Sequence, residues 1–153
     1  MTDNLVEMVM IVKDSGSKII GMLESWVKHI DYFTIVDTGS TDQTISNIKK
    51  VFKKHNYKNY AVHEREIVIY DKLPDEQIID FGATRNMALD LAKKNCDWTV
   101  MMDDTYELVC TDSAKNGFRN ILNILKNNDK VDAVHNVIRT TEIDENKNPL
   151  TAE

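Results

Sequence analysis

The sequence predicts an α/β protein with a mostly parallel central sheet and helices on both of its faces. Short, largely apolar runs alternate with longer amphipathic segments, and such runs are typical of strands that are buried on both faces. Strands that alternate with helices form right-handed crossover units, so the strands lie parallel. With 153 residues, of which 42% are hydrophobic, we expect one domain over residues 1–153.

The first half of the chain shows this pattern most clearly. The run VEMVMIV is short and apolar, which suits a buried parallel strand, and apolar side chains recur at helical spacing after it. The run YFTIVD is a second such strand, and the helix after it would bury Ile45 and Ile48. Ser40 or Thr41 would cap that helix, and Asp42 would complement its positive end. The predicted elements are strand 6–12, helix 17–30, strand 32–37 and helix 40–54.

The second half is predicted from the same signals. A strand falls within YAVHEREIVIY, residues 60–70, although the pattern leaves open whether it is one strand or two. A polar segment with a proline follows as a loop, and the next helix would bury Met87, Ala88 and Leu91. The remaining predicted elements are loop 71–82, helix 83–95, strand 97–103, helix 112–128, strand 131–139 and a polar tail, 140–153.

Composition limits the class of function. A net charge of −6 gives no general attraction for nucleic acid, and it repels anionic nucleotides unless a cation or a local basic group intervenes. No apolar run approaches the ~20 residues that span a bilayer, and the N-terminus lacks the features of a secretion signal. Two cysteines, Cys96 and Cys110, are too few for a disulfide framework or a zinc cage. We expect reduced thiols in an intracellular, cytoplasmic protein.

Polar loops follow three of the predicted strands. They are KDSGS (13–17), DTGSTD (37–42) and DDTYE (103–107). The carboxyl ends of parallel strands lie at one edge of a sheet, and open α/β sheets bind their ligands there. We therefore expect any functional site at that edge.

The segment DTGSTD joins the second strand to a helix. Gly39 permits a tight turn, and one interpretation is simply a well-capped strand-to-helix connection. That interpretation does not account for Asp37, whose carboxylate can accept a hydrogen bond from a base N–H or a ribose hydroxyl. The turn lacks the other glycines of G-x-G-x-x-G, so a dinucleotide fingerprint is not supported.

Two adjacent acids, Asp103 and Asp104, end the fourth predicted strand. Carboxylates ~4 Å apart repel by about 1 kcal/mol in water, and a divalent cation reverses the sign. Carboxylate, hydroxyl and phosphate oxygens are the ligands that Mg²⁺ or Mn²⁺ prefers. A phosphatase of the haloacid-dehalogenase type is excluded, because Met101 stands where its nucleophilic aspartate would be. An Arg in a first helical turn is usually solvated, but Arg85 lies at the positive end of a helix, which is better explained if it points at a base or a phosphate.

Three segments together resemble the family 2 glycosyltransferases, which have the Rossmann-like GT-A fold. They are MVMIVKDSGSKIIGMLESW, IVDTGSTDQT and DFGATRNMALDLAKKNCDWTVMMDD, in order between Met8 and Asp104. The resemblance implies a nucleotide-diphosphate sugar as donor, most often a UDP sugar, together with Mn²⁺ or Mg²⁺. It also implies transfer of the sugar to a hydroxyl acceptor on a glycan, a protein or a lipid.

The same resemblance implies roles for individual residues. Asp37 and Arg85 would fix the base, and Asp103 to Thr105 would occupy the family's Asp-x-Asp metal motif. The expected nucleotide-binding residues are Val12, Lys13, Asp14, Asp37, Thr38, Gly39, Arg85 and Asp103, and the expected metal ligands are Asp103, Asp104 and Thr105.

The chain departs from the family pattern at two places. Lys13-Asp14-Ser15 stands where relatives read Lys-Asn-Glu, and Thr105 stands at the second, metal-contacting aspartate. We expect Asp104 to take that place with a shift of one residue. There are two alternatives: the Thr105 hydroxyl binds the metal ion weakly, or metal binding is impaired.

In such enzymes the acceptor-binding half, with its catalytic base, lies C-terminal to the nucleotide-binding half. We expect residues 1–153 to lack that half and to form one domain of a longer protein, so no catalytic base is assigned. One alternative function is a degenerate, non-catalytic module that binds a nucleotide or a partner. Another, a nucleotidyltransferase, would need a Gly-rich basic loop after the first strand, and KDSGSK is a poor version of it.

Overall fold

The computed structural model describes residues 4–70, 78–93, 96–108, 117–128 and 130. The chain divides into two compact units, residues 1–107 and 108–153. In the second unit the described helix is α4 (Gly117–Leu125), which lies within the predicted helix 112–128. The predicted strand 131–139 lies outside the described residues. The expectation of one nucleotide-sugar-binding domain stays a prediction.

The first unit is built on a four-stranded sheet in which every pairing is parallel. The strand order is β3–β2–β1–β6, which is compatible with a Rossmann-like fold. The α/β class and the parallel sheet are therefore confirmed, and the first two strands have the predicted bounds. The strands are β1 (Val6–Val12), β2 (Tyr32–Asp37), β3 (Tyr60–Glu64) and β6 (Trp98–Met101).

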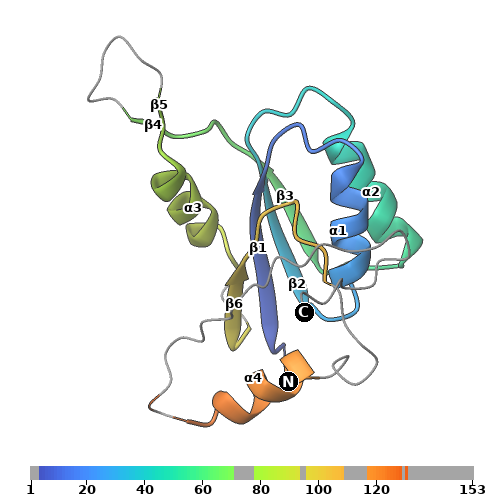
Figure 1. Cartoon of the computed structure of the whole chain (residues 1–153), viewed down its shortest axis with the longest axis vertical. Helices are drawn as coiled ribbons and strands as arrows, with labels where there is room; N and C mark the ends of the chain where they lie inside the picture. Colours follow the sequence, from blue (N-terminus) through green and yellow to red (C-terminus); the bar gives the residue numbers. More distant parts are fainter. Residues whose placement is uncertain (1–3, 71–77, 94–95, 109–116, 129, 131–153) are drawn as a thin grey trace, which may run out of the picture. The chain divides into compact units, whose positions relative to one another are not determined.

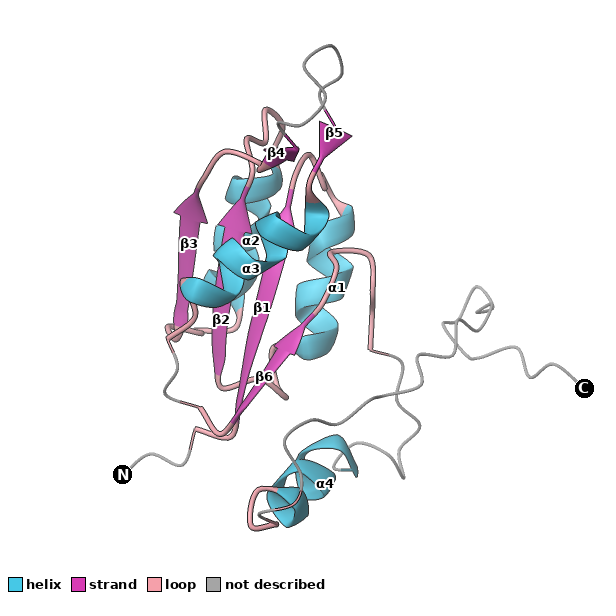
Figure 2. Cartoon of the chain, turned by 90° about the vertical axis from the view of Figure 1, so that its left-hand side faces the viewer, coloured by secondary structure: helices cyan, strands magenta, loops and turns pink. Residues whose placement is uncertain are grey.

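Helices cover both faces of this sheet, as predicted. Helices α1 (Lys18–Trp26) and α2 (Thr44–Lys54) lie on one face, and α3 (Phe81–Asp90) lies on the other (Figures 1 and 2). Within the described residues, no helix is both long enough and apolar enough to cross a membrane.

Side-chain alternation along the strands decides which residues face which helices. The ring of Phe33 in β2 lies 5.2 Å from that of Phe52 in α2. Tyr60, the register partner of Phe33 on β3, has its ring 4.3 Å from Phe52. Val36 belongs instead to a buried cluster with Ala88 of α3. Odd-numbered residues of β2 therefore face α1 and α2, and even-numbered ones face α3.

Helix α2 begins four residues later than predicted, at Thr44. The Oδ1 atom of Asp42 accepts a hydrogen bond from the Thr44 N–H at 2.8 Å and so satisfies a donor of the first turn. The side chains of the predicted caps, Ser40 and Thr41, bond instead to Asp14 in the neighbouring loop. The prediction of the cap is wrong because a partner distant in sequence takes both side chains.

The segment between β3 and α3 contains a small second sheet. Strand β4 (Ile69–Tyr70) pairs antiparallel with β5 (Ile78–Ile79). The region 60–70 thus holds two strands, and β5 lies in the predicted loop 71–82. That part of the loop prediction is wrong, because Ile78 and Ile79 pair with β4, and no local sequence pattern indicates this pairing.

The boundaries of the later elements also shift. Helix α3 starts at Phe81, two residues early, because the Asp80 carboxylate accepts a hydrogen bond from the Ala83 N–H at 2.8 Å and caps it. Helix α1 ends at Trp26 rather than at residue 30, and β6 is shorter than predicted at both ends.

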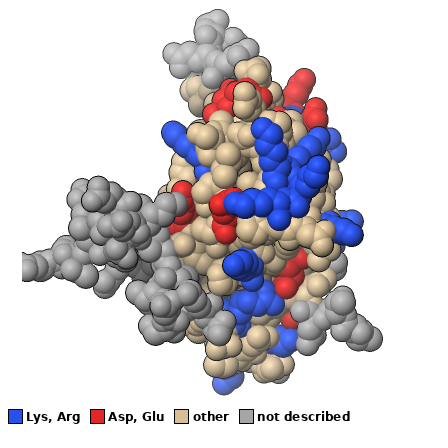
Figure 3. Space-filling model, turned by 90° about the vertical axis from the view of Figure 1, so that its right-hand side faces the viewer, with Lys and Arg blue, Asp and Glu red and all other residues tan. Residues whose placement is uncertain are grey.

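The outer side of α2 is basic, although the chain carries a net charge of −6. Lys49, Lys50, Lys53 and Lys54 are exposed on this helix, and Figure 3 shows basic side chains gathered on the side of the molecule that α1 and α2 form. The Lys54 ammonium pairs with the Glu24 carboxylate at 2.6 Å. Lysines in the last helical turn also complement its negative end, which gives this charge a structural explanation.

Candidate functional site

The three polar loops predicted at one edge of the sheet are connected by hydrogen bonds. The Asp14 N–H donates to Ser40 Oγ at 2.9 Å, and the Thr41 N–H donates to Asp14 Oδ1 at 2.7 Å. These bonds join the loop after β1 to the loop after β2. The Ser15 hydroxyl donates to Asp104 Oδ2, which joins the loop after β6 as well. The prediction that these loops meet is confirmed.

Several residues expected to border a nucleotide hold this edge together. Asp14 adopts a left-handed backbone, with φ 48°, which costs a non-glycine residue about 1 kcal/mol. Its carboxylate binds the backbone and the hydroxyl of Thr41. The Thr38 N–H and hydroxyl both donate to the Val12 carbonyl, at 2.9 and 3.1 Å. Lys13 is exposed.

The Asp42 carboxylate gives the fold a testable acid dependence. The hydrogen bond from the Thr44 hydroxyl, followed by that from its N–H, lowers the pKa of Asp42 below its usual 3.8. A carboxyl group with a lowered folded-state pKa contributes stability that is fully present above the unfolded pKa and is lost as the pH falls through the folded one. In urea unfolding, wild type should exceed Asp42→Asn in stability at about pH 6, and the difference should shrink at about pH 2.5. A constant difference across this range would contradict the assignment.

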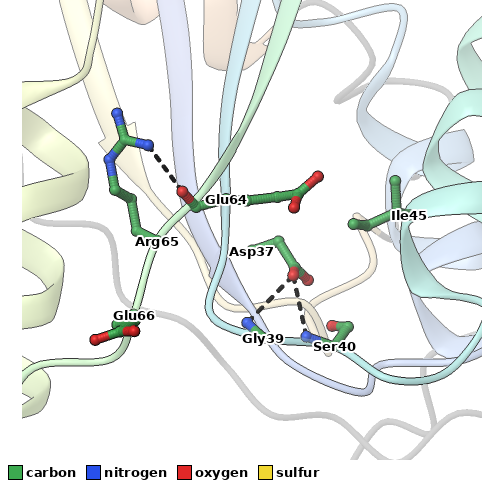
Figure 4. Close-up of a pocket in the computed structure, with 7 residues that line it drawn as sticks. All are labelled: Asp37, Gly39, Ser40, Ile45, Glu64, Arg65 and Glu66. Carbon is green, nitrogen blue, oxygen red and sulfur yellow. Dashed lines mark hydrogen bonds between the residues drawn. The ribbon is translucent and has the colours of Figure 1, made fainter.

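A pocket of about 330 Å³ opens at the carboxyl ends of β2 and β3 (Figure 4). Asp37, Gly39 and Ser40 come from the end of β2 and its turn. Ile45 comes from α2, Glu64 is the last residue of β3, and Arg65 and Glu66 follow it. The full lining is Asp37, Gly39, Ser40, Ile45, Glu64, Arg65 and Glu66. Of the predicted site residues, the pocket therefore contains Asp37 and Gly39.

Asp37 is 2% exposed, and its two carboxylate oxygens have different surroundings. Oδ2 accepts hydrogen bonds from the N–H groups of Gly39 and Ser40, at 3.2 and 3.0 Å. Oδ1 is buried and has no hydrogen-bond partner among the described residues. A buried acceptor without a donor costs about 1–3 kcal/mol, so such atoms normally have a partner. Asp37 therefore closes the turn through Oδ2, a role that the structural interpretation of DTGSTD did not include, and its Oδ1 has no donor among the described residues.

Arg85 does not line the pocket, because its guanidinium is engaged elsewhere. Its Nη2 lies 3.0 Å from Asp103 Oδ1, and the two side chains are 39% and 41% exposed. The guanidinium also lies over the Phe81 ring, 5.8 Å from its centroid. A pair this exposed contributes at most about 1 kcal/mol. Arg85 therefore holds Asp103 on the α3 side of the sheet edge.

The predicted metal ligands Asp103 and Asp104 are each held by one hydrogen bond within the chain, and metal binding by them stays a prediction. Asp103 and Asp104 each use one oxygen, for Arg85 and Ser15, and the other oxygen of each makes no hydrogen bond to another described residue. In the part of the chain that the structure describes, no group of three or more His, Cys, Asp or Glu side chains could hold a metal. Mg²⁺ is commonly held by one or two carboxylates plus substrate phosphates, and this donor set suits that mode. Thr105 is exposed and adds a hydroxyl next to it.

The pocket and the acidic pair lie at different strand tips of one edge. Asp37 ends β2, Asp103 follows β6, and β1 lies between the two strands. With neighbouring strands ~4.8 Å apart, the two tips are separated by roughly 10 Å. An extended ligand could therefore reach both, and a compact one could not.

Five lining residues were missed from the sequence: Ser40, Ile45, Glu64, Arg65 and Glu66. A signal existed for Glu64, because it ends the apolar run of β3 as Asp37 ends that of β2. Applying the strand-end rule to the third strand as well would have found it.

No protein-family model matches this chain, and no curated protein matches it. The class of protein thus follows from the fold and the site alone. It is an α/β protein with a parallel sheet, compatible with a Rossmann-like fold, and a pocket at the carboxyl edge of that sheet.

Proposed function

We propose that the first unit binds a nucleoside diphosphate sugar and serves as the donor-binding part of a GT-A glycosyltransferase. One observation carries the proposal: Asp37, which lines a pocket at the sheet edge, has a buried carboxylate oxygen without a partner among the described residues. A base N–H or a ribose hydroxyl would supply the missing donor. Open α/β sheets bind their ligands at this edge, which supports the same assignment.

The spacing of the two acidic positions suggests how the ligand would lie. The base would occupy the pocket, and the chain of phosphates would pass the tip of β1 toward Asp103 and Asp104. These carboxylates and the Thr105 hydroxyl would hold Mn²⁺ or Mg²⁺, which would stabilise the charge on the departing nucleoside diphosphate. Arg85 and Ser15 would orient the two carboxylates through the bonds described above. We place acceptor binding and the general base outside the described residues.

A second candidate is a nucleotide-binding module without transfer activity. The ion pair between Arg85 and Asp103 favours it, since the guanidinium neutralises part of the charge that would attract a metal. Thr105 in place of an aspartate points the same way. Transfer and hydrolysis assays with UDP and GDP sugars separate the two candidates, because only the first gives turnover.

The proposal predicts metal-dependent binding of nucleoside diphosphates. In isothermal titration calorimetry, Mn²⁺ should tighten the binding of UDP or GDP at least about tenfold over binding in EDTA, because the ion offsets carboxylate–phosphate repulsion. The double variant Asp103→Asn/Asp104→Asn should lose this difference. Uridine and guanosine, which lack phosphates, serve as controls whose affinity should not depend on Mn²⁺. If no nucleotide binds with or without the ion, the proposal fails.

A further inference from the structure

We infer that the pocket recognises a guanine base through two carboxylates, Asp37 and Glu64, which lie side by side on neighbouring strands. The inference rests on the proposed function and narrows its donor to a guanosine diphosphate sugar. The family resemblance, in contrast, most often implies a UDP sugar as the donor.

Glu64 is the register partner of Asp37 on the adjacent strand. Register partners point to the same face of a sheet. Tyr60, four residues before Glu64, packs against α2, so both carboxylates face the α2 side. Figure 4 shows the two side chains extending toward Ile45. The side chain of Arg65 extends away from them, and its Nη1 donates to the Glu64 backbone carbonyl at 2.8 Å, so it leaves the Glu64 carboxylate unneutralised.

The carboxylates of these two residues offer hydrogen-bond acceptors to a ligand, and they offer no donors. Asp37 cannot bind two donors in a bidentate manner, because its Oδ2 already accepts two backbone N–H groups. Only its Oδ1 is left for a ligand. In the described part of the chain, the Glu64 carboxylate makes no hydrogen bond, and it can supply the second acceptor from the neighbouring strand. A ligand edge with two adjacent donors would satisfy both oxygens and separate two like charges.

Guanine presents such an edge, with its N1–H beside its exocyclic amino group. Uracil has a single N–H between two carbonyl oxygens, one of which would meet the Glu64 carboxylate acceptor to acceptor. Adenine and cytosine place an amino group beside a ring nitrogen that is itself an acceptor. Polar groups of a base that meet an unmatched polar group in the pocket lose affinity, so guanine fits the pair Asp37 and Glu64 best.

The test compares GDP with inosine diphosphate, which keeps the N1–H and lacks the amino group. Binding is measured by calorimetry on the full chain with Mn²⁺, and UDP and CDP complete the panel. Wild type should bind GDP about tenfold or more tightly than inosine diphosphate or UDP. In Glu64→Ala, GDP should weaken to the level of inosine diphosphate, whose own affinity should change by less than about threefold. Asp90→Ala, which removes an equal charge from the exposed end of α3, should keep the wild-type ratio.

The outcomes of this test distinguish the guanine assignment from the proposed function. Glu64 is exposed, so its alanine variant should fold, and circular dichroism checks this. Equal binding of GDP and inosine diphosphate by wild type, or an unchanged ratio in Glu64→Ala, overturns the guanine assignment and leaves the proposed function standing. Absence of binding by every nucleotide overturns both.

Discussion

Replacing Asp37 by asparagine is expected to weaken the binding of GDP or UDP by about 10–100-fold, because it removes a charge-assisted hydrogen bond of about 1.5–3 kcal/mol. The amide oxygen can still accept the N–H groups of Gly39 and Ser40, so the turn should persist. The amide NH₂ would then occupy the position of Oδ1 and face the base N–H, donor against donor. Little change is expected in the free energy of unfolding.

Two comparisons make this prediction specific. Asp37→Ala should also lose the turn contacts, so its unfolding midpoint in urea should fall, whereas that of Asp37→Asn should stay near wild type. CDP offers an acceptor where uracil and guanine offer an N–H, so its affinity relative to GDP should rise in Asp37→Asn. Calorimetry on wild type and Asp37→Asn measures this ratio of affinities. If Asp37→Asn bound every nucleotide with the affinity of wild type, Asp37 would not contact the base, and the main support for the proposed function would be lost.

Replacing Glu7 by alanine is expected to lower the free energy of unfolding by about 3 kcal/mol. Glu7 is fully buried in β1, on the face that α3 covers. Its Oε1 accepts hydrogen bonds from the Thr34 hydroxyl at 2.6 Å and from the Lys93 N–H at 2.9 Å. Alanine would leave the buried hydroxyl without this acceptor and would open a cavity. Because Lys93 follows α3, the same bond ties the helix that carries Arg85 to the sheet.

Urea unfolding of three variants separates the contributions to this loss. Glu7→Gln keeps the shape and one acceptor, so it should be less destabilised than Glu7→Ala. Thr34→Val removes only the hydroxyl donor, and its effect should be smaller than that of alanine at position 7. Were Glu7→Ala as stable as wild type, the buried carboxylate would not hold β1, β2 and the end of α3 together.

The local sequence pattern was sufficient to predict those elements whose burial depends on their own residues. Strands 6–12 and 32–37 were predicted with their observed bounds, because each is an apolar run that ends at a charged or polar residue. Their alternation with helices also predicted the parallel sheet, and that topology brings the loops after β1, β2 and β6 to one edge. The place of Asp37 at this edge could be predicted for the same reason, since it ends a strand.

Tertiary structure decided which side chains meet across the sheet and between loops. Asp37 and Glu64 are neighbours only through the register of β2 and β3, and no periodicity within either strand encodes that register. Arg85 pairs with Asp103, and Ser40 and Thr41 leave the helix terminus for Asp14, because loops far apart in sequence compete for the same groups. Hydrophobic periodicity records which face of a segment is buried. Long-range packing then selects the partner of each polar group. For this reason the sequence predicted which edge of the sheet carries the site, whereas only the tertiary structure showed which residues line the pocket.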